Sequence, residues 1–331
     1  MTTIQIDAET KGGDADVQAD PAMGTSVLPG RDALDRQTLQ DLSRKSDRAG
    51  LLHLAGHLLV IAASAGAVYA TGDALWLKVQ VMVFLGFAID TLFAPMHECV
   101  HGTPFASRRL NRIVGWLTGA AIGWNATYYR RFHAWHHRYT QDPDNDPELM
   151  TPKPRTTWDY VMRLSGLPYY RDQMKILLRC AFGAIGGQPF IPARGIGEIQ
   201  RSALLQLSLY GAVAAASVYY ESWIAVTYWL LPMVMAQPFM RFMLLAEHTG
   251  CSEDRNGLTN TRTTYCTRPA RFLMWNMPFH AEHHLYPSVP FHALPKVHEA
   301  VKSRLAHISA DYKAAHEEIR EDMKSARNAP A

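Results

Sequence analysis

The sequence predicts an all-α integral membrane protein, with four transmembrane helices in two hairpins and a helical cap on the cytoplasmic side. Three observations predict this class. Four apolar stretches have the roughly 20 residues that cross the hydrocarbon core of a bilayer. Short polar links join them in pairs, and basic residues gather between the pairs. A soluble all-α protein with buried core helices is the alternative, but four such runs seldom occur in one soluble domain.

The first part of the chain, residues 1–45, is rich in Asp, Thr, Gly and Ala and shows little periodicity. Such a segment buries too little apolar surface to fold, so we expect a disordered cytoplasmic tail. It also lacks the basic region, apolar run and cleavage site of a secretory signal. The membrane domain is expected at residues 46–310, and a C-terminal tail at residues 311–331.

The four predicted spans are residues 51–70, 75–93, 203–220 and 223–245. The links within each pair, residues 71–74 and 221–222, are so short that each pair forms a tight hairpin. Both hairpin tips are therefore expected on the same side of the membrane. A weaker stretch at residues 113–124 contains three glycines and is too short to span readily, so we expect a partly immersed or surface helix.

Charge predicts the orientation of these spans. The hairpin tips carry Asp73 and Glu221, whereas the segment between the hairpins carries twelve basic residues from Arg108 to Arg179. Basic segments stay in the cytoplasm, so both termini and the middle segment are predicted there. Residues 159–182 mix apolar and basic residues and are expected to form an amphipathic helix on the head groups.

Eight of the fifteen histidines form three clusters at helical spacing. Steps of three and four residues place the imidazoles of one cluster on one face of a helix. All three clusters fall on the side of the membrane that is predicted to be cytoplasmic. The clusters are His97 and His101; His133, His136 and His137; and His280, His283 and His284.

This number of imidazoles predicts a site for two metal ions. Without metal, the clusters would bury unpaired donors or mutually repelling cations. Eight nitrogens are too many for one tetrahedral zinc, whereas two metals would keep positions open for O₂ or water. Imidazole suits iron, copper and zinc alike, and only chemistry on a lipid favours iron. A metal-storage protein is the non-catalytic alternative, but storage does not need a span beside each cluster.

Four carboxylates are candidates to orient these rings through their second nitrogen. Glu98, Glu247 and Glu282 each sit beside a clustered histidine, and for them a solvated surface position is an equal alternative. Asp90 lies inside a predicted span, two helical turns before His97 and on the same face. An acid within a span indicates a functional role.

Residues 97–101 also match the H-E-x-x-H pattern, in which two histidines bind zinc and the glutamate acts as general base. An intramembrane metalloprotease is therefore the competing class of enzyme. Such a site needs one metal and one further ligand, and it leaves the other two clusters unexplained. Cys99 points away from the face that carries His97 and His101, so it is not expected to be a ligand.

The remaining histidines and one acidic segment receive structural interpretations. The acid-rich segment after the second cluster resembles the start of a calcium loop, but Pro147 and Lys153 stand where the glycine and the bidentate glutamate belong, so a turn is expected. His53 and His57 are interpreted as structural residues near the interface. The histidines interpreted as surface residues are His292, His298, His307 and His316.

In their order and spacing, the patterns H-x-x-x-H, H-x-x-H-H and H-x-x-H-H resemble the membrane fatty acid desaturase superfamily, which includes acyl hydroxylases and carotenoid ketolases. The flanking residues 95–102 and 276–280 are similar to its bacterial branch, and the resemblance covers about residues 51–298. It implies a non-haem centre of two iron ions that uses O₂ as co-substrate. It also implies His248 as a ninth ligand.

The resemblance further implies an external electron donor, such as a ferredoxin or rubredoxin, because the haem-binding segment of members with a fused cytochrome is absent. The expected function is O₂-dependent oxidation of a membrane lipid, above all desaturation of a fatty acyl chain. Hydroxylation of the chain or of a polar head group, such as that of an aminolipid, and carotenoid ketolation remain open. The formal net charge of only +3 and the absence of a basic stripe argue against a nucleic-acid partner.

Overall fold

The chain is helical over most of its length in the computed structural model, which describes residues 30–328. The prediction of a disordered tail at residues 1–29 lies outside this range. The first helices are η1 (Arg31–Ala33), α1 (Arg36–Leu42), α2 (Asp47–Ala70), α3 (Leu75–Asp90), α4 (Phe93–His101), α5 (Arg108–Ala121), α6 (Ala126–Tyr139), η2 (Pro147–Met150), α7 (Thr157–Ser165) and α8 (Leu167–Ala181).

The second half continues the helical pattern and adds two very short strands. These strands pair in parallel, with Thr263 opposite Ile308 and Thr264 opposite Ser309. The elements are α9 (Ala193–Tyr219), η3 (Val226–Leu230), α10 (Leu231–Leu245), β1 (Thr263–Thr264), α11 (Arg268–Leu273), α12 (His280–Leu285), α13 (Leu294–Val301), η4 (Lys302–Arg304), β2 (Ile308–Ser309) and α14 (Tyr312–Asn328).

Three helices of the described chain are long and apolar enough to cross a membrane: Asp47–Ala70, Leu75–His101 and Ala193–Tyr219. They correspond to the first three predicted spans. The fourth predicted span is not one regular α-helix, because residues Val226–Leu230 form a π-helix and leave only Leu231–Leu245 as α10. Pro232, two residues after the end of the π-helix, has no N–H to give to the preceding turn, which is a local reason for the irregularity.

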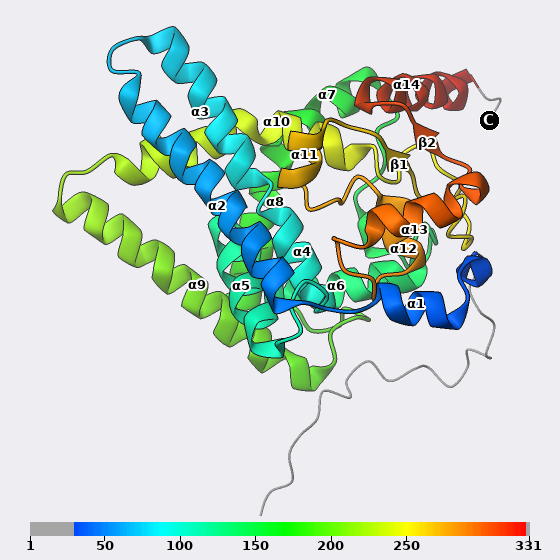
Figure 1. Ribbon diagram of the computed structural model, residues 1–331. Helices are drawn as coiled ribbons and strands as arrows, with labels where there is room; N and C mark the ends of the chain where they lie inside the picture. Colours follow the sequence, from blue (N-terminus) through cyan, green and yellow to red (C-terminus); the bar gives the residue numbers. More distant parts are fainter. Residues whose placement is uncertain (1–29, 329–331) are drawn as a thin grey trace, which may run out of the picture.

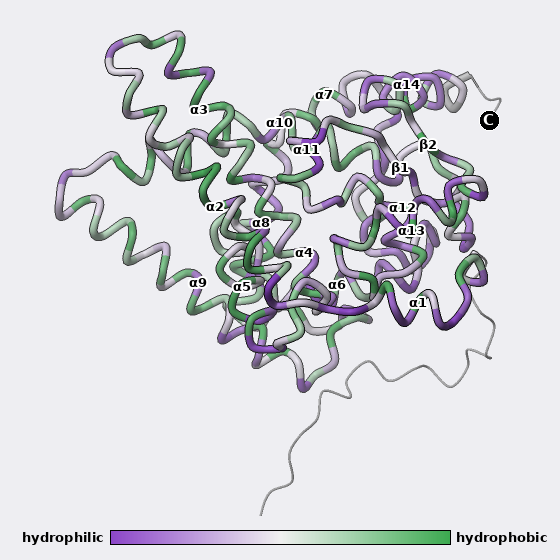
Figure 2. The backbone as a smooth tube through the Cα atoms, in the orientation of Figure 1, coloured by the Kyte–Doolittle hydropathy of each residue, from purple (hydrophilic) through white to green (hydrophobic). Residues whose placement is uncertain are grey.

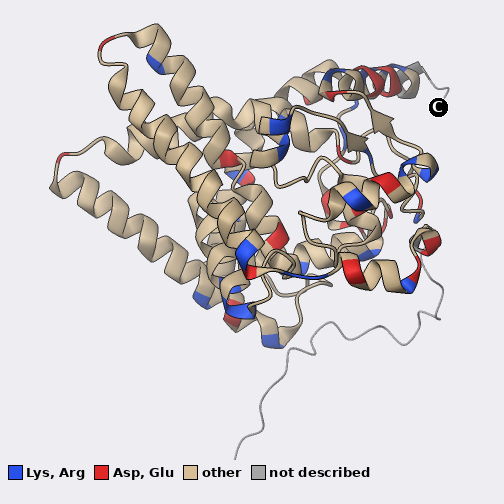
Figure 3. Ribbon diagram, viewed as in Figure 1, with Lys and Arg blue, Asp and Glu red and all other residues tan. Residues whose placement is uncertain are grey.

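The two helical hairpins project on the same side of the molecule, with α2 and α3 in one and α9 and α10 in the other (Figure 1). Residues 71–74 and 221–222 form the turns, as predicted. The outer lengths of these helices are largely apolar (Figure 2). Acidic residues mark the tips, and basic residues lie at the opposite ends of α5 and α9 (Figure 3).

Close packing between α3 and α10 holds the two hairpins together. Gly86 of α3 lies against the backbone of α10, where a Cβ atom would come within 1.8 Å of the Pro232 carbonyl oxygen. A glycine is therefore required at this crossing. Around it, the main apolar core gathers Leu85, Met96 and Trp275, all fully buried.

His53 and His57 have structural roles beside this core, as predicted. The Trp275 indole N–H donates to His57 Nδ1 over 3.1 Å, and His57 Nε2 is hydrogen-bonded to the Ala88 carbonyl oxygen over 2.8 Å. His53 Nε2 is likewise hydrogen-bonded to the Phe272 carbonyl oxygen over 2.8 Å. These contacts tie α2 to α3 and to the C-terminal part of the chain.

α1 and α6 lie together with the C-terminal helices, on the side of the molecule opposite the hairpin tips (Figure 1). The part of the predicted N-terminal tail that the structure describes is ordered, because Leu34 is buried and its N–H donates to the Tyr286 hydroxyl over 3.0 Å. The predicted C-terminal tail instead contains α14, which buries Ala315, His316 and Ile319. Both segments pack apolar side chains that the composition of the tails did not reveal.

Two further helices differ from their predicted form. Residues 159–182 were expected to form one amphipathic helix, but the chain turns at Gly166, whose φ of 73° is left-handed, and divides into α7 and α8. Pro168 at the start of α8 favours this break, because its ring cannot continue the preceding helix. The weak stretch at residues 113–124 belongs to α5, which begins earlier, at Arg108.

Candidate metal centre

Three short helices carry the eight clustered histidines, as predicted. α4 follows α3 after a turn at Thr91 and Leu92 and ends at Gly102, whose φ of 65° stops the helix. Asn125 caps α6 from the position before its first residue, since its side chain accepts a hydrogen bond from the Tyr128 N–H. All six residues of α12 are buried, so its three imidazoles point into the protein.

One group of ring nitrogens joins all three clusters. Each of its five histidines offers a nitrogen, and these nitrogens lie within 4.8 Å of one another. His137 Nε2 is 2.9 Å from His133 Nε2 and 3.1 Å from His283 Nε2. The members are His97, His101, His133, His137 and His283.

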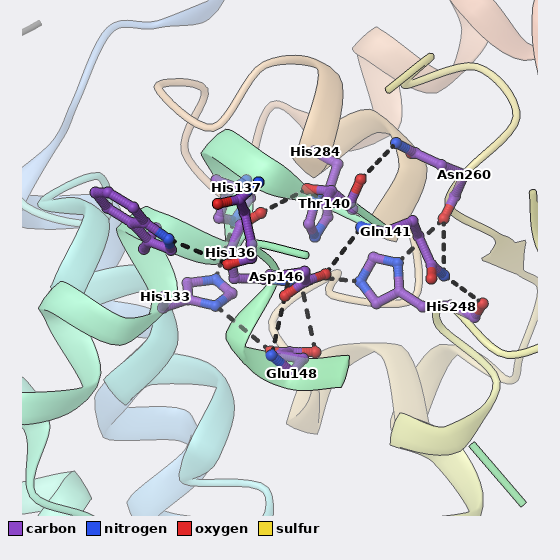
Figure 4. Close-up of polar contacts among 12 residues, drawn as sticks. His133, His136, His137, Thr140, Gln141, Asp146, Glu148, His248, Asn260 and His284 are labelled. Atoms are coloured by element: carbon purple, nitrogen blue, oxygen red, sulfur yellow. Dashed lines mark hydrogen bonds and ion pairs between the residues drawn. The ribbon is translucent and has the colours of Figure 1, made fainter. Parts of the chain in front are cut away.

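A second group lies beside the first and includes the ninth predicted ligand. Nitrogens of His136, His248 and His284 lie within 4.8 Å of one another, and His280 Nε2 is 3.1 Å from His248 Nε2. The ring of His284 also stacks on His137 of the first group, with centroids 4.0 Å apart. The structure thus brings all nine predicted histidines into two adjacent groups, part of which Figure 4 shows.

Hydrogen bonds from the outer ring nitrogens fix several imidazoles (Figure 4). His248 Nδ1 donates to the Asn260 carbonyl oxygen over 3.2 Å. His284 Nδ1 donates over 3.2 Å to the Thr140 hydroxyl, which uses its own hydrogen on the His136 carbonyl oxygen. His136 Nδ1 is 2.8 Å from a carboxylate oxygen of Asp146. Such bonds leave the opposite nitrogen, Nε2, without a hydrogen and aimed at the second group.

The facing nitrogens need a cation between them. His136 and His248 each use Nδ1–H on an oxygen acceptor, yet their Nε2 atoms are only 3.3 Å apart. Two bare nitrogens at this distance repel each other, whereas a proton or a metal ion between them removes the repulsion. The donor set therefore fits a metal ion.

Buried nitrogens without partners support the same conclusion. Within residues 30–328, both ring nitrogens of His97, Nε2 of His101 and Nε2 of His284 are buried and have no hydrogen-bond partner. A buried polar atom without a partner costs about 1–3 kcal/mol. Metal coordination satisfies these nitrogens and removes that cost.

Burial keeps most of these rings neutral, which is the form that binds a metal. Burial and then the neighbouring imidazoles hold the pKa of His133, His137 and His283 well below the ordinary value. Burial also lowers the pKa of His248 to about 3, with His136 as the next cause. His136 is the exception: burial opposes its protonation, but Glu148 and Asp146 outweigh burial and raise its pKa.

The carboxylates predicted from sequence take up different positions. Glu98 accepts hydrogen bonds from the Thr103 hydroxyl and the Phe291 N–H, and its other oxygen is 3.9 Å from His283 Nδ1, too far for a hydrogen bond. Asp90 is buried, and neither of its oxygens has a hydrogen-bond partner in the described part of the chain.

Glu282 contacts a histidine outside the three clusters. One of its oxygens accepts a hydrogen bond from His298 Nδ1 and the other from the Thr263 hydroxyl. Glu282 therefore anchors the side of α12 that faces away from the imidazoles. Of the flanking glutamates, Glu247 comes closest to a clustered ring, with Oε2 3.5 Å from His280 Nε2.

The surface interpretation was wrong for two histidines. His298 is buried between Glu282 and Tyr265, whose hydroxyl is 2.9 Å from its Nε2. His316 is buried on α14, where it stacks on Phe242 and bonds to the Phe242 carbonyl oxygen. Both contacts join segments far apart in the sequence, which no local pattern indicates.

Two further acids at the centre were interpreted only as parts of a turn. Asp146 contacts His136 and also accepts hydrogen bonds from the N–H groups of Gln141 and Glu148. The half-buried Glu148 places one oxygen 4.0 Å from His133 Nδ1 and the other 3.8 Å from His136 Nε2, so it can offer an oxygen ligand. Both acids follow the second histidine cluster after only a short loop, and this closeness in the sequence could have indicated that they contact it.

The profile of the fatty acid desaturase family matches residues 73–315, well over half of the chain. A sphingolipid delta(4)-desaturase of Drosophila melanogaster is 26% identical over 235 residues, which cover 69% of this chain and 67% of that protein. An sn-1 oleoyl-lipid 12-desaturase of Picosynechococcus is 24% identical over 267 residues, or 74% of this chain and 75% of that protein.

A dihydrorhizobitoxine desaturase of Bradyrhizobium elkanii is 25% identical over 286 residues, which cover 79% of this chain and 77% of that protein. Relatives from Drosophila and from bacteria are thus similar to a comparable degree, and membership of a bacterial branch stays a prediction. The matched region contains all nine converging histidines, and nothing in it favours a protease. The chain belongs to the fatty acid desaturase family and is an oxidoreductase.

Proposed function

We propose that this oxidoreductase uses O₂ and two iron ions to desaturate a fatty acyl chain of a membrane lipid. The observation that carries the proposal is the convergence of nine imidazoles into two adjacent groups. The names of two relatives, a sphingolipid desaturase and an oleoyl-lipid desaturase, support a lipid substrate. Hydroxylation and carotenoid ketolation use the same kind of ligand set, so the product decides among them.

Each group of nitrogens would hold one ion. One ion would be held by His97, His101, His133, His137 and His283, and the other by His136, His248, His280 and His284. Imidazole nitrogen is a suitable ligand for iron. Iron bound there supplies the O₂-dependent oxidation of an unactivated C–H bond.

The protein itself orients the ligands and excludes water. Asp146 and the Asn260 carbonyl oxygen fix the rings of His136 and His248. Glu98 and Glu282 position the ligands indirectly, because they anchor the helices α4 and α12, which carry histidines, to other segments of the C-terminal part of the chain. Asp90, which is buried in a span without a partner, is proposed as a functional acid at the same centre.

The proposal includes a place in the membrane. Four spans would cross it, with the irregular helix of residues 224–245 as the fourth and with the hairpin tips outside. The histidines, both termini and the segment that carries α5 to α8 would then lie at the cytoplasmic face of an inner membrane. Electrons would come from a separate protein such as a ferredoxin or rubredoxin.

Lipid mass spectrometry of cells with and without this protein tests the proposed reaction. We expect a lipid that has lost two hydrogen atoms in cells that make the protein. The variant His283→Ala removes one ligand and should abolish the product, whereas His292→Ala, an exposed histidine outside the centre, should retain it. The purified protein should contain iron rather than zinc. A product that gains one oxygen atom indicates hydroxylation, and unchanged lipids refute the proposal.

A further inference from the structure

A basic cavity of about 1320 Å³ lies between α5, α6 and the start of α9. Eight of its lining side chains are basic and one, Glu198, is acidic. Its lining also includes His101 and the neighbouring Cys99 and Gly102. The cavity therefore meets the first nitrogen group of the candidate metal centre at His101.

Part of the positive charge of this cavity has no acidic partner in the described chain. Glu198 pairs with both Arg130 and Arg131, at 3.1 Å and 2.9 Å, so this trio keeps one positive charge. Within residues 30–328, Arg112 and Arg201 are exposed and form no ion pair. Gathered cations repel one another, and an anion in the cavity removes that repulsion.

The wall of the cavity is built around one of these cations. The guanidinium of Arg131 lies over Gly195 of α9, where a Cβ atom would come within 2.8 Å of Arg131 Cζ. Its Nε–H is buried and has no hydrogen-bond partner in the described chain. The hydroxyl of Ser202 joins the three helices, since it accepts hydrogen bonds from Trp116 Nε1 and the Thr127 hydroxyl.

Apolar side chains line the same cavity. Ile113 and Leu117 of α5 and Leu205 of α9 are 45%, 54% and 58% exposed, and α9 is one of the helices long enough to cross a membrane. The volume exceeds the roughly 300–1,000 Å³ of an ordinary small-molecule pocket. Basic and apolar lining residues and this size together fit a lipid with an anionic head better than a protein partner, which would cover a surface.

We propose that this cavity binds the head group of the substrate, and that the substrate is therefore a lipid whose head carries a net negative charge, such as a phosphatidylglycerol. This inference rests on the proposed function for its assumption that a membrane lipid is oxidised. The recognising chemistry is that of arginine with phosphate oxygens, which forms short, charge-assisted hydrogen bonds.

Binding can be measured without turnover by native mass spectrometry of the detergent-purified protein. We expect it to retain dioleoyl phosphatidylglycerol over dioleoyl phosphatidylcholine by at least about tenfold, because both lipids carry the phosphate but only phosphatidylcholine adds a choline cation, which the unpaired arginines repel. The double variant Arg112→Gln/Arg201→Gln should lose this preference. Arg112→Lys/Arg201→Lys, which keeps the charge, should restore most of it.

A matched control removes two exposed basic residues outside the cavity, in Arg171→Gln/Lys175→Gln on α8. This variant should keep the preference for the anionic lipid. Equal retention of both lipids by the unaltered protein, or an equal loss in the control, overturns the inference. Inorganic phosphate that binds as tightly as the lipid would also overturn it, because the site would then recognise a free anion.

Measurements of reduction by an electron donor and of lipid oxidation distinguish a failure of this inference from a failure of the proposed function. If Arg112→Gln/Arg201→Gln slows reduction by an acidic ferredoxin but leaves lipid binding unchanged, the cavity serves the electron donor and the inference is wrong. If phosphatidylglycerol binds selectively but no lipid is ever oxidised, the proposed function fails and the binding site stands. If both lipids are oxidised at equal rates, the proposed function stands and the head-group preference fails.

Discussion

Asp146 Oδ1 lies 2.8 Å from Nδ1 of His136, ten residues earlier in the chain. Both side chains are almost fully buried. The carboxylate holds the ring so that Nε2 points at His248, and it favours the protonated form of His136 when no metal is present. A turn of the chain thus positions one of the nine converging imidazoles.

The variant Asp146→Asn tests this positioning. It keeps an oxygen for one of the two backbone N–H groups and removes the negative charge beside His136, so we expect metal affinity to fall by about 10–100-fold. Metal content after dialysis against a graded chelator measures the change. Asp144→Asn, an exposed acid in the same turn, is the control and should bind metal normally. Equal affinity in both variants would show that Asp146 only stabilises the turn.

The stability of the metal-free protein should depend on pH through its buried histidines. Burial lowers the pKa of His248 to about 3, and burial also lowers the pKa of five others in the centre. In the unfolded chain these rings take up protons near pH 6.5. The unfolded state therefore binds more protons below that pH, and the free energy of unfolding falls as the pH decreases from about 6.5 toward the folded pKa.

Each such histidine lowers the free energy of unfolding by up to about 1.4 kcal/mol per pH unit in that window. His136, Glu148 and Glu247, whose pKa values are raised, contribute in the opposite direction, but they are three groups against six histidines. Thermal unfolding of the metal-free protein in detergent should give a Tm that falls steeply below pH 6.5. A Tm that does not change between pH 7 and pH 5 would contradict the buried, neutral state of these rings.

Glu282 and His298 form a buried pair behind α12, and each should be costly to remove alone. Their side chains are 0% and 5% exposed, so either single truncation leaves a buried group without its partner. We expect Glu282→Ala to lower the free energy of unfolding by about 3–5 kcal/mol. A double-mutant cycle with His298→Ala should show strong coupling, and additive losses would mean that the two residues act separately.

The crossing of α3 and α10 should not tolerate a side chain at Gly86. A methyl group there would meet the Pro232 carbonyl oxygen, so Gly86→Ala should destabilise the protein by about 1–3 kcal/mol or more. Gly66 of α2 is the matched control, because a Cβ atom there meets nothing within 4 Å. Gly66→Ala should leave the Tm unchanged or raise it slightly, since alanine favours the helix. Equal Tm values would refute the close packing.

Periodic features of the sequence predicted most of the fold. The length of the apolar stretches predicted the positions of α2, α3 and α9. Steps of three and four residues predicted that the histidines of each cluster share one helix face, and the clusters lie on α4, α6 and α12. The regularity of residues 224–245 was not predictable in the same way, because the apolar pattern is identical for an α-helix and for one interrupted by a π-helical turn. Pro232 was the local sign of that turn.

The site was predictable in its ligands and less so in their partners. His248 stands alone in the sequence and was found only through family resemblance, although its Nε2 lies 3.3 Å from that of His136. Glu282 was paired with the adjacent imidazoles, but the structure pairs it with His298. Contacts of this kind join residues far apart in the chain, so sequence neighbourhood is a poor guide to which acid meets which ring.

Glu98 and Phe291, which share a hydrogen bond, are 193 residues apart, and the converging imidazoles come from segments almost as distant. α12 has only six residues, too few to be stable in isolation. It acquires its shape from Glu282 on one side and from the ring nitrogens on the other. A growing chain that has not yet reached residue 298 therefore has no complete site, and the proposed metal ions would be acquired late in synthesis or after release from the ribosome.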